Sequence, residues 1–163
     1  MYEMNGGVPE KAAARSDWQT QDMPAQQARY FLKKKLTSEQ LETLKRGHVP
    51  QAMEDKWFWF YEDDRLYIHR SWTGICIYIL RFYIEEGKIL VISNRDPRQY
   101  KCMDNQEDAA QLSWLLDSCS NPDRDYRQEW MAETLLTIQK AKAQEAAGNS
   151  AETPKKQNNI PAE

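Results

Sequence analysis

The sequence has few of the residues from which disulfide frameworks, metal centres and phosphate-binding loops are built. Its three cysteines, Cys76, Cys102 and Cys119, are odd in number and widely spaced, so no disulfide framework is predicted. His48, His69 and these cysteines lack the paired short spacing of metal ligands. The chain has only six glycines, and no glycine-rich loop follows a predicted strand, which disfavours the common NTP-binding enzymes. We therefore expect no metal and no cofactor.

Long apolar runs and an excess of positive charge are also missing. No segment approaches the roughly 20 apolar residues that cross a bilayer, and the N-terminal residues contain no apolar stretch typical of a secretory signal. The net charge is −3 and the isoelectric point about 5.5, whereas a general nucleic-acid binder normally carries a basic patch or stripe. These absences predict a cytoplasmic, reduced protein with no membrane binding and no general nucleic-acid binding.

The 163 residues are enough for one domain with a buried core and too few for two. Residues 1–24 show no hydrophobic periodicity and are expected to form a flexible N-terminal arm. Residues 144–163 have almost no apolar content, too little to offset the entropy lost on ordering, and are expected to form a disordered C-terminal tail. A single α+β domain should therefore span residues 25–143.

Helices are predicted on both sides of a central region. The clearest signal follows Thr37, because Thr37 and Gln40 fit a capping box in front of an apolar periodic run. A shorter helix is expected at roughly 25–35. After the central region, residues 106–118 place their apolar side chains on one helical stripe, and a last helix is expected to be capped by Asn121.

In the central region the hydrophobic period changes to two, which is typical of strands. The predicted strands are joined by short polar turns and cover residues 57–61, 66–71, 75–84 and 88–94. Consecutive hairpins of this kind form a four-stranded antiparallel meander. With helices before and after it, the sheet predicts an α+β fold in which the meander packs with N-terminal and C-terminal helices.

Ten of the eighteen aromatic side chains lie in residues 57–83. Alternate residues of a strand point to opposite faces. A mainly aliphatic face is expected to hold Leu66, Ile68, Ile75, Ile77 and Ile79. A mainly aromatic face is expected to hold Tyr67, His69, Ser71, Tyr78 and Phe82. The aliphatic face should seat the helices, and the aromatic face is either a second core beneath further helices or a surface that another molecule reaches.

The turn at residues 69–74 is the expected centre of a binding site. Arginine forks suit phosphate or carboxylate groups, and aromatic rings stack on planar ligands. Arg81 stands inside an apolar strand, where its charge either pairs with a carboxylate such as Glu62 or Glu85 or binds a ligand. The candidate ligand-binding residues are His69, Arg70, Ser71, Trp72, Thr73, Lys56, Trp57, Tyr67 and Arg81.

Residues 47–82 combine a Gly-His-x-Pro lead-in, a Met-x-x-Lys-Trp-Phe strand and a His-Arg-Ser-Trp-Thr-Gly turn. In these motifs, over about a quarter of its length, the sequence resembles a small uncharacterised bacterial domain. Such segments stand alone or beside ADP-ribose-handling domains of the macro or ADP-ribosylglycohydrolase kind. The resemblance implies a bacterial or phage origin and a nucleotide-like ligand, and it implies no particular activity.

We expect a non-catalytic binding or protein-interaction module that uses the aromatic sheet face and the turn at 69–74, because no catalytic signature accompanies the rings and arginines. The alternative is an enzyme acting on an ADP-ribosyl or nucleotide-type substrate, with His69 as acid or base and Arg70 or Arg81 holding phosphate. The expected partner is an unknown protein or a nucleotide-like small molecule. A homodimer joined through the aromatic face is a third alternative.

Overall fold

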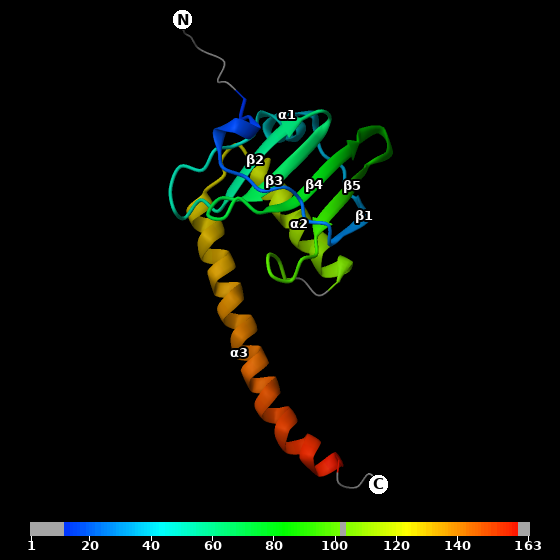
Figure 1. Cartoon of the computed structure of the whole chain (residues 1–163), viewed down its shortest axis with the longest axis vertical. Coiled ribbons are helices and arrows are strands. Elements are labelled where there is room, and N and C mark those ends of the chain that lie inside the picture. Colours follow the sequence, from blue (N-terminus) through cyan, green and yellow to red (C-terminus); the bar gives the residue numbers. More distant parts are fainter. Residues whose placement is uncertain (1–11, 102–103, 160–163) are drawn as a thin grey trace, which may run out of the picture. The chain divides into compact units, whose positions relative to one another are not determined.

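The computed structural model describes residues 12–101 and 104–159, with side chains described as far as residue 146. The chain divides into two units between Arg124 and Asp125. The first unit is an α+β domain (Figure 1). Its elements are η1 (Arg15–Asp17), β1 (Gln27–Lys33), α1 (Ser38–Arg46), β2 (Trp57–Glu62), β3 (Arg65–Arg70), β4 (Cys76–Tyr83), η2 (Ile84–Glu86), β5 (Lys88–Asn94) and α2 (Asn105–Cys119). The second unit contains the long helix α3 (Tyr126–Asn159).

The strands form one antiparallel sheet in the order β1-β5-β4-β3-β2. Strands β2 to β5 pair consecutively, so the predicted meander is confirmed. The sheet has a fifth strand, because β1 pairs with β5 along its whole length, from Gln27 opposite Asn94 to Lys33 opposite Lys88. The prediction of a helix at residues 25–35 is therefore wrong.

The alternation of buried and exposed side chains in β1 favours a strand over a helix. Tyr30 and Leu32 pack against the buried core, whereas Arg29, Phe31 and Lys33 are exposed. In a helix these consecutive side chains would spread around the whole cylinder. In a strand they separate into one buried and one exposed side, and β5 supplies the backbone hydrogen-bond partners.

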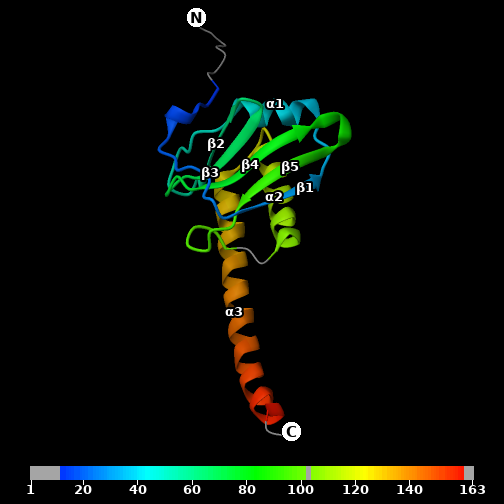
Figure 2. The same ribbon diagram turned by 45° about the vertical axis from the view of Figure 1, so that its right-hand side comes forward.

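One face of the sheet carries the main core. The register places Leu66 opposite Leu80 and Ile68 opposite Tyr78, so these four side chains share a face. Other members of the buried cluster are Leu44 of α1, Trp57, Trp59, Ile89 and Val91 of the sheet, and Leu112, Leu115, Leu116 and Cys119 of α2. Figures 1 and 2 both show α2 behind the sheet.

This register corrects the predicted assignment of faces. Leu66 and Ile68 were expected on one face of the sheet and Tyr78 on the other, whereas the structure shows all three on the helix-covered face. Tyr67 instead lies opposite Ile79 on the other face. The alternation within each strand was sound, but the parity between β3 and β4 depends on the turn that joins them and on a register shift after Ile68.

The segment before β1 covers one half of that other face. The ring of Trp18 stacks on Phe58 with 6.1 Å between centroids, and its indole N–H donates to the carbonyl of Ser71 over 2.8 Å. The guanidinium of Arg15 lies 4.8 Å from the ring centroids of both Phe60 and Tyr67. Figure 1 shows this segment, in blue, crossing the strands on the side away from α2.

Backbone hydrogen bonds hold the same segment in place. The N–H of Ala13 donates to the carbonyl of Arg46, and the N–H of Gln21 donates to the carbonyl of Gly74, both over 2.8 Å. The predicted flexible arm covered residues 1–24; its described part, residues 12–24, lies on the sheet, and residues 1–11 lie outside the described residues.

A buried carboxylate ties α2 to the sheet. Asp108 is fully buried and accepts hydrogen bonds from the hydroxyls of Tyr30 over 2.8 Å and Tyr78 over 2.9 Å, and from that of Tyr100. Arg95 Nη1 lies 3.3 Å from the same carboxylate. Because its oxygens are satisfied and its charge is paired, Asp108 is tolerated inside the core and fixes the helix against β1, β4 and the end of β5.

The predicted start of α1 is confirmed. The Thr37 hydroxyl accepts from the N–H of Gln40 over 3.0 Å, and the side chain of Gln40 accepts from the N–H of Thr37 over 2.9 Å. This reciprocal pair satisfies two of the backbone donors that a helix start leaves without partners. Helix α2 likewise lies within one residue of the predicted span at either end.

Helix α3 differs from its prediction at both ends. It begins at Tyr126 rather than directly after Asn121, because residues 121–125 form turns in which the side chain of Asn121 accepts from the N–H of Asp123 over 2.9 Å. It continues through residues 144–159, where the sequence predicts a disordered tail. Residues 160–163 lie outside the described residues.

Candidate functional site

The predicted turn at residues 69–74 is largely built into the fold. His69 is 1% exposed, and its Nδ1 lies 2.9 Å from the carbonyl oxygen of Gly74. Burial lowers the pKa of His69 from the usual 6.5, which favours the neutral ring. Ser71 is also buried, and its backbone N–H donates to the carbonyl of Lys56. Neither His69 Nε2 nor Ser71 Oγ has a hydrogen-bond partner among the described residues. Both atoms are buried, and this burial keeps them from contact with a ligand.

Gly74 shows why this turn packs closely against the N-terminal segment. Its φ is +76°, and a Cβ there would lie 2.3 Å from the carbonyl oxygen of Gln19. Only glycine fits both the left-handed backbone and the close approach. The turn is therefore shaped by the chain that covers it.

The outer side of the turn is exposed. Trp72 is 66% exposed, and its indole N–H donates to the carbonyl of Met53 over 2.7 Å, which fixes the ring at the surface. The hydroxyl of Thr73 accepts from the N–H of Ile75 over 3.2 Å. The guanidinium of Arg70 lies 4.4 Å from the ring centroid of Trp57, which is itself buried. A binding role for Lys56, Trp57, Arg70, Trp72 and Thr73 stays a prediction.

Tyr67 and Arg81 lie on a different surface from this turn. Across the sheet, Tyr67 is opposite Ile79, Ile79 is opposite Ile92, and Ile92 is opposite Arg29. Arg81 lies two residues beyond Ile79 on β4, on the same face, opposite Leu90. The structure thus separates the predicted site residues into two groups. Arg81 lies on the uncovered half of this other face, and Tyr67 lies at its border with the N-terminal segment.

A hollow of about 240 Å³ lies on this uncovered half. Its floor is formed by Ile79, Leu90 and Ile92, and Tyr67 lies at the side toward the N-terminal segment. Three exposed arginines surround it: Arg29 of β1, Arg65 of β3 and Arg81 of β4. We call this the arginine hollow.

The arginines of this hollow are not neutralised by any carboxylate that the structure describes. Among the described residues, none of the three arginines forms an ion pair, and the guanidinium of Arg81 lies 5.8 Å from the ring centroid of Tyr83. Of the carboxylates proposed as partners for Arg81, Glu62 pairs instead with Arg15 over 3.1 Å. The hollow therefore carries concentrated positive charge above an apolar floor.

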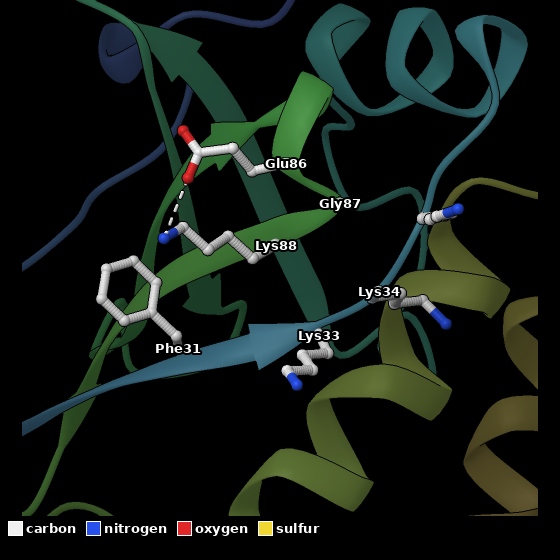
Figure 3. Close-up of a pocket in the computed structure, with 7 residues that line it drawn as sticks. Phe31, Lys33, Lys34, Glu86, Gly87 and Lys88 are labelled. Carbon is white, nitrogen blue, oxygen red and sulfur yellow. Dashed lines mark ion pairs between the residues drawn. The ribbon is translucent and has the colours of Figure 1, made fainter.

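A second hollow, of about 660 Å³, lies beside it at the end of β1 (Figure 3). It is lined by Phe31, Lys33, Lys34, Lys35, Glu86, Gly87 and Lys88. We call this the lysine hollow. Figure 3 shows Lys88 paired with Glu86 over 2.9 Å and next to the ring of Phe31. Lys34 pairs with Asp117 over 2.9 Å, whereas no ion pair joins Lys33 or Lys35 to a described residue.

Arg29, Phe31 and Lys33 were not among the predicted site residues, because residues 25–35 were expected to form a helix. The signal was present in the alternation of Arg29, Phe31 and Lys33 with Tyr30 and Leu32, which is the period of a strand. The missing information was the pairing partner of the segment.

A buried ion pair lies away from both hollows. His48 Nε2 is 2.6 Å from Oδ2 of the fully buried Asp55, and Arg124 is 3.3 Å from Oδ1. Although burial opposes it, the hydrogen bond from His48 and the nearby charge of Arg124 hold the pKa of Asp55 below its usual value. This cluster holds the loop before β2 in place, and both carboxylate oxygens of Asp55 already have partners.

Within the described residues, no group of three or more histidine, cysteine, aspartate or glutamate side chains is arranged to hold a metal ion. None of the described helices has the length and apolar character needed to span a membrane. No protein-family model matches the sequence, and neither a curated protein nor a solved structure matches it significantly.

Proposed function

We propose that this protein is a non-catalytic binding module that takes an anionic, nucleotide-like ligand on the arginine hollow. The single observation that carries the proposal is the grouping of Arg29, Arg65 and Arg81 around an apolar floor with no carboxylate partner among the described residues. Guanidinium groups bind phosphate and carboxylate through paired N–H donors. The apolar floor suits the uncharged part of a ligand that lies flat on the sheet.

The chemistry of the hollow favours binding over proton transfer. Its lining contains arginine, aliphatic and tyrosine side chains. His69, which the sequence suggested as an acid or base, does not line the hollow and is almost fully buried. The enzyme alternative therefore depends on groups other than His69 and stays a prediction.

The test is binding of defined anionic probes to the wild type and to arginine variants. The probes are inorganic pyrophosphate, ATP, ADP-ribose, a poly-glutamate peptide and a mixed-sequence single-stranded oligonucleotide of about 12 nucleotides. Binding is measured by thermal shift and titration calorimetry at about 0.05 M salt, where screening is weak. A bound probe stabilises the fold by about 2.7 kcal/mol at a hundredfold excess over its Kd.

We expect at least one probe to stabilise the wild type and Arg65→Gln and Arg81→Gln each to weaken its binding by about tenfold. Arg46→Gln is the matched control, because Arg46 is exposed at the end of α1 and lines neither hollow. If no probe binds, or if the arginine variants bind as the wild type does, the proposal is wrong. The same calorimetric runs detect turnover of ATP or ADP-ribose, the result that the enzyme alternative predicts.

A further inference from the structure

The two hollows form one continuous surface. Arg81, which lines the arginine hollow, is opposite Leu90, and Leu90 is opposite Phe31, which lines the lysine hollow. Two residues along the strands, and on the same face, Lys88 is opposite Lys33. We call this surface the basic sheet face. Five cations stand on its strands, at Arg29, Lys33, Arg65, Arg81 and Lys88.

We infer that the ligand of the basic sheet face is a short stretch of single-stranded nucleic acid lying across both hollows. This inference rests on the proposed function, because it needs the arginine hollow to bind an anion. It goes beyond it by naming a polymer and by including the lysine hollow in the site.

The size of the surface supports a polymer. Three strand spacings separate β3, which carries Arg65, from β1, which carries Lys33, and at ~4.8 Å each this amounts to about 14 Å. Four residues along β5, from Ile92 to Lys88, add about 13 Å in the other direction. A mononucleotide covers one hollow. A chain of about four nucleotides, the lower end of the site sizes of single-strand binding domains, covers both.

The cations match a backbone that repeats its charge. Single-strand binding proteins combine a positively charged track for phosphates with side chains that hold the bases. Here the cations extend from Arg65 and Arg81 to Lys33, so successive phosphates meet successive positive charges. Within the part of the chain that the structure describes, Glu86 is the only carboxylate that lines either hollow, and it is paired with Lys88.

An exposed phenylalanine ring favours nucleic acid over an acidic polypeptide. Phe31 is 54% exposed on the sheet, and Tyr83 lies beside it with 6.2 Å between ring centroids. The ammonium of Lys88 is 4.5 Å from the ring centroid of Phe31. A nucleobase stacks on such a ring whatever its identity, whereas a chain of glutamates gains only from the charges. Phe31 is therefore the residue that separates the two kinds of ligand.

The closing experiment measures fluorescence anisotropy of the labelled oligonucleotide with the wild type and three variants. Phe31→Leu keeps the apolar bulk and removes the ring, and it should weaken binding by about tenfold. Phe31→Tyr restores a ring and should bind as the wild type does. Lys33→Gln should remove about one phosphate contact and reduce the slope of log K against log salt by about 0.7. Phe31 and Lys33 are both exposed, so the three variants should retain the fold.

The outcomes separate this inference from the proposed function. If the arginine variants lose binding but ATP binds as tightly as the oligonucleotide, the ligand is a mononucleotide and the inference is overturned. It is also overturned if poly-glutamate competes equally, or if Phe31→Leu and Lys33→Gln have no effect. If no probe shows arginine-dependent binding, the proposed function fails as well.

Discussion

The placement of the N-terminal segment on the sheet predicts a large effect of replacing Trp18. The substitution Trp18→Ala removes the indole hydrogen bond to the Ser71 carbonyl and the stacking of the ring on Phe58. The hydrogen bond contributes about 1 kcal/mol and the ring pair about 1 kcal/mol. Trp18 is half-buried, so about 100 Å² of apolar surface is also exposed, at about 2.5 kcal/mol.

Partial relaxation at the surface reduces this total, and we expect a loss of about 3 kcal/mol in the free energy of unfolding. For a domain of this size, the melting temperature should fall by on the order of 10 °C. Trp18→Phe keeps a ring on Phe58 but cannot donate to Ser71, so it should lose about 1 kcal/mol. Gln19→Ala is the control, because its side chain is exposed, and it should change stability by less than about 0.5 kcal/mol.

The assay is urea unfolding of the full chain, followed by circular dichroism and supported by amide hydrogen exchange. The backbone amides of Ala13 and Gln21 should exchange slowly because both donate to carbonyls of the domain. If Trp18→Ala is as stable as Gln19→Ala and both amides exchange freely, residues 12–24 do not lie on the sheet. The flexible arm expected from the sequence would then be correct.

Two further predictions concern buried polar groups. Asp108→Ala removes the buried carboxylate that pairs with the guanidinium of Arg95 and accepts from the hydroxyl of Tyr78, and it should cost about 3–5 kcal/mol, whereas Asp108→Asn, which keeps an acceptor, should cost less in the same urea assay. His69 has a lowered pKa, so below pH 6.5 the unfolded chain binds a proton that the folded chain does not, and stability should fall as the pH falls. His69→Gln should flatten this part of the pH–stability curve; an unchanged slope in unfolding measurements from about pH 7 to 5 would show that the histidine is not buried.

Features with a strong local signal could be predicted from the sequence. The capping box at Thr37 depends on two side chains and the backbone between them, and it forms as expected. The hairpins of β2 to β5 are joined by short polar turns, so each strand finds its partner next to it in the chain. These elements need no knowledge of distant residues.

The structural predictions were wrong where contacts with residues distant in the sequence determine the local structure. Strand β1 pairs with β5, about 60 residues away, and the apolar run of Tyr30, Phe31 and Leu32 suits a helix or a strand equally well until that partner is known. The N-terminal segment has little apolar content. It is held by backbone hydrogen bonds from Ala13 and Gln21, which cannot be predicted from the amino-acid composition.

The candidate site was predicted in part for the same reason. Tyr67 and Arg81 were singled out from their own strands, and both lie at the arginine hollow. Arg29 and Arg65 complete that hollow only because β1 joins the sheet and β3 lies beside β4. His69 was expected to be accessible because the covering segment was assigned to a flexible arm. The net charge of −3 did not predict an anion-binding surface, because it does not show that cations are concentrated on one face of the sheet.

The sign of the charge on this face distinguishes binding from mere solubility. An open sheet face on which Ile79, Leu90 and Ile92 are only half-buried needs charged neighbours to prevent association with other chains. Acidic and basic residues serve that purpose equally well, and mixed signs serve it best because they leave no net field. Here the arginine hollow has one sign only, although the chain as a whole contains more acidic than basic residues. Solubility alone does not require this segregation, whereas recognition of an anion does.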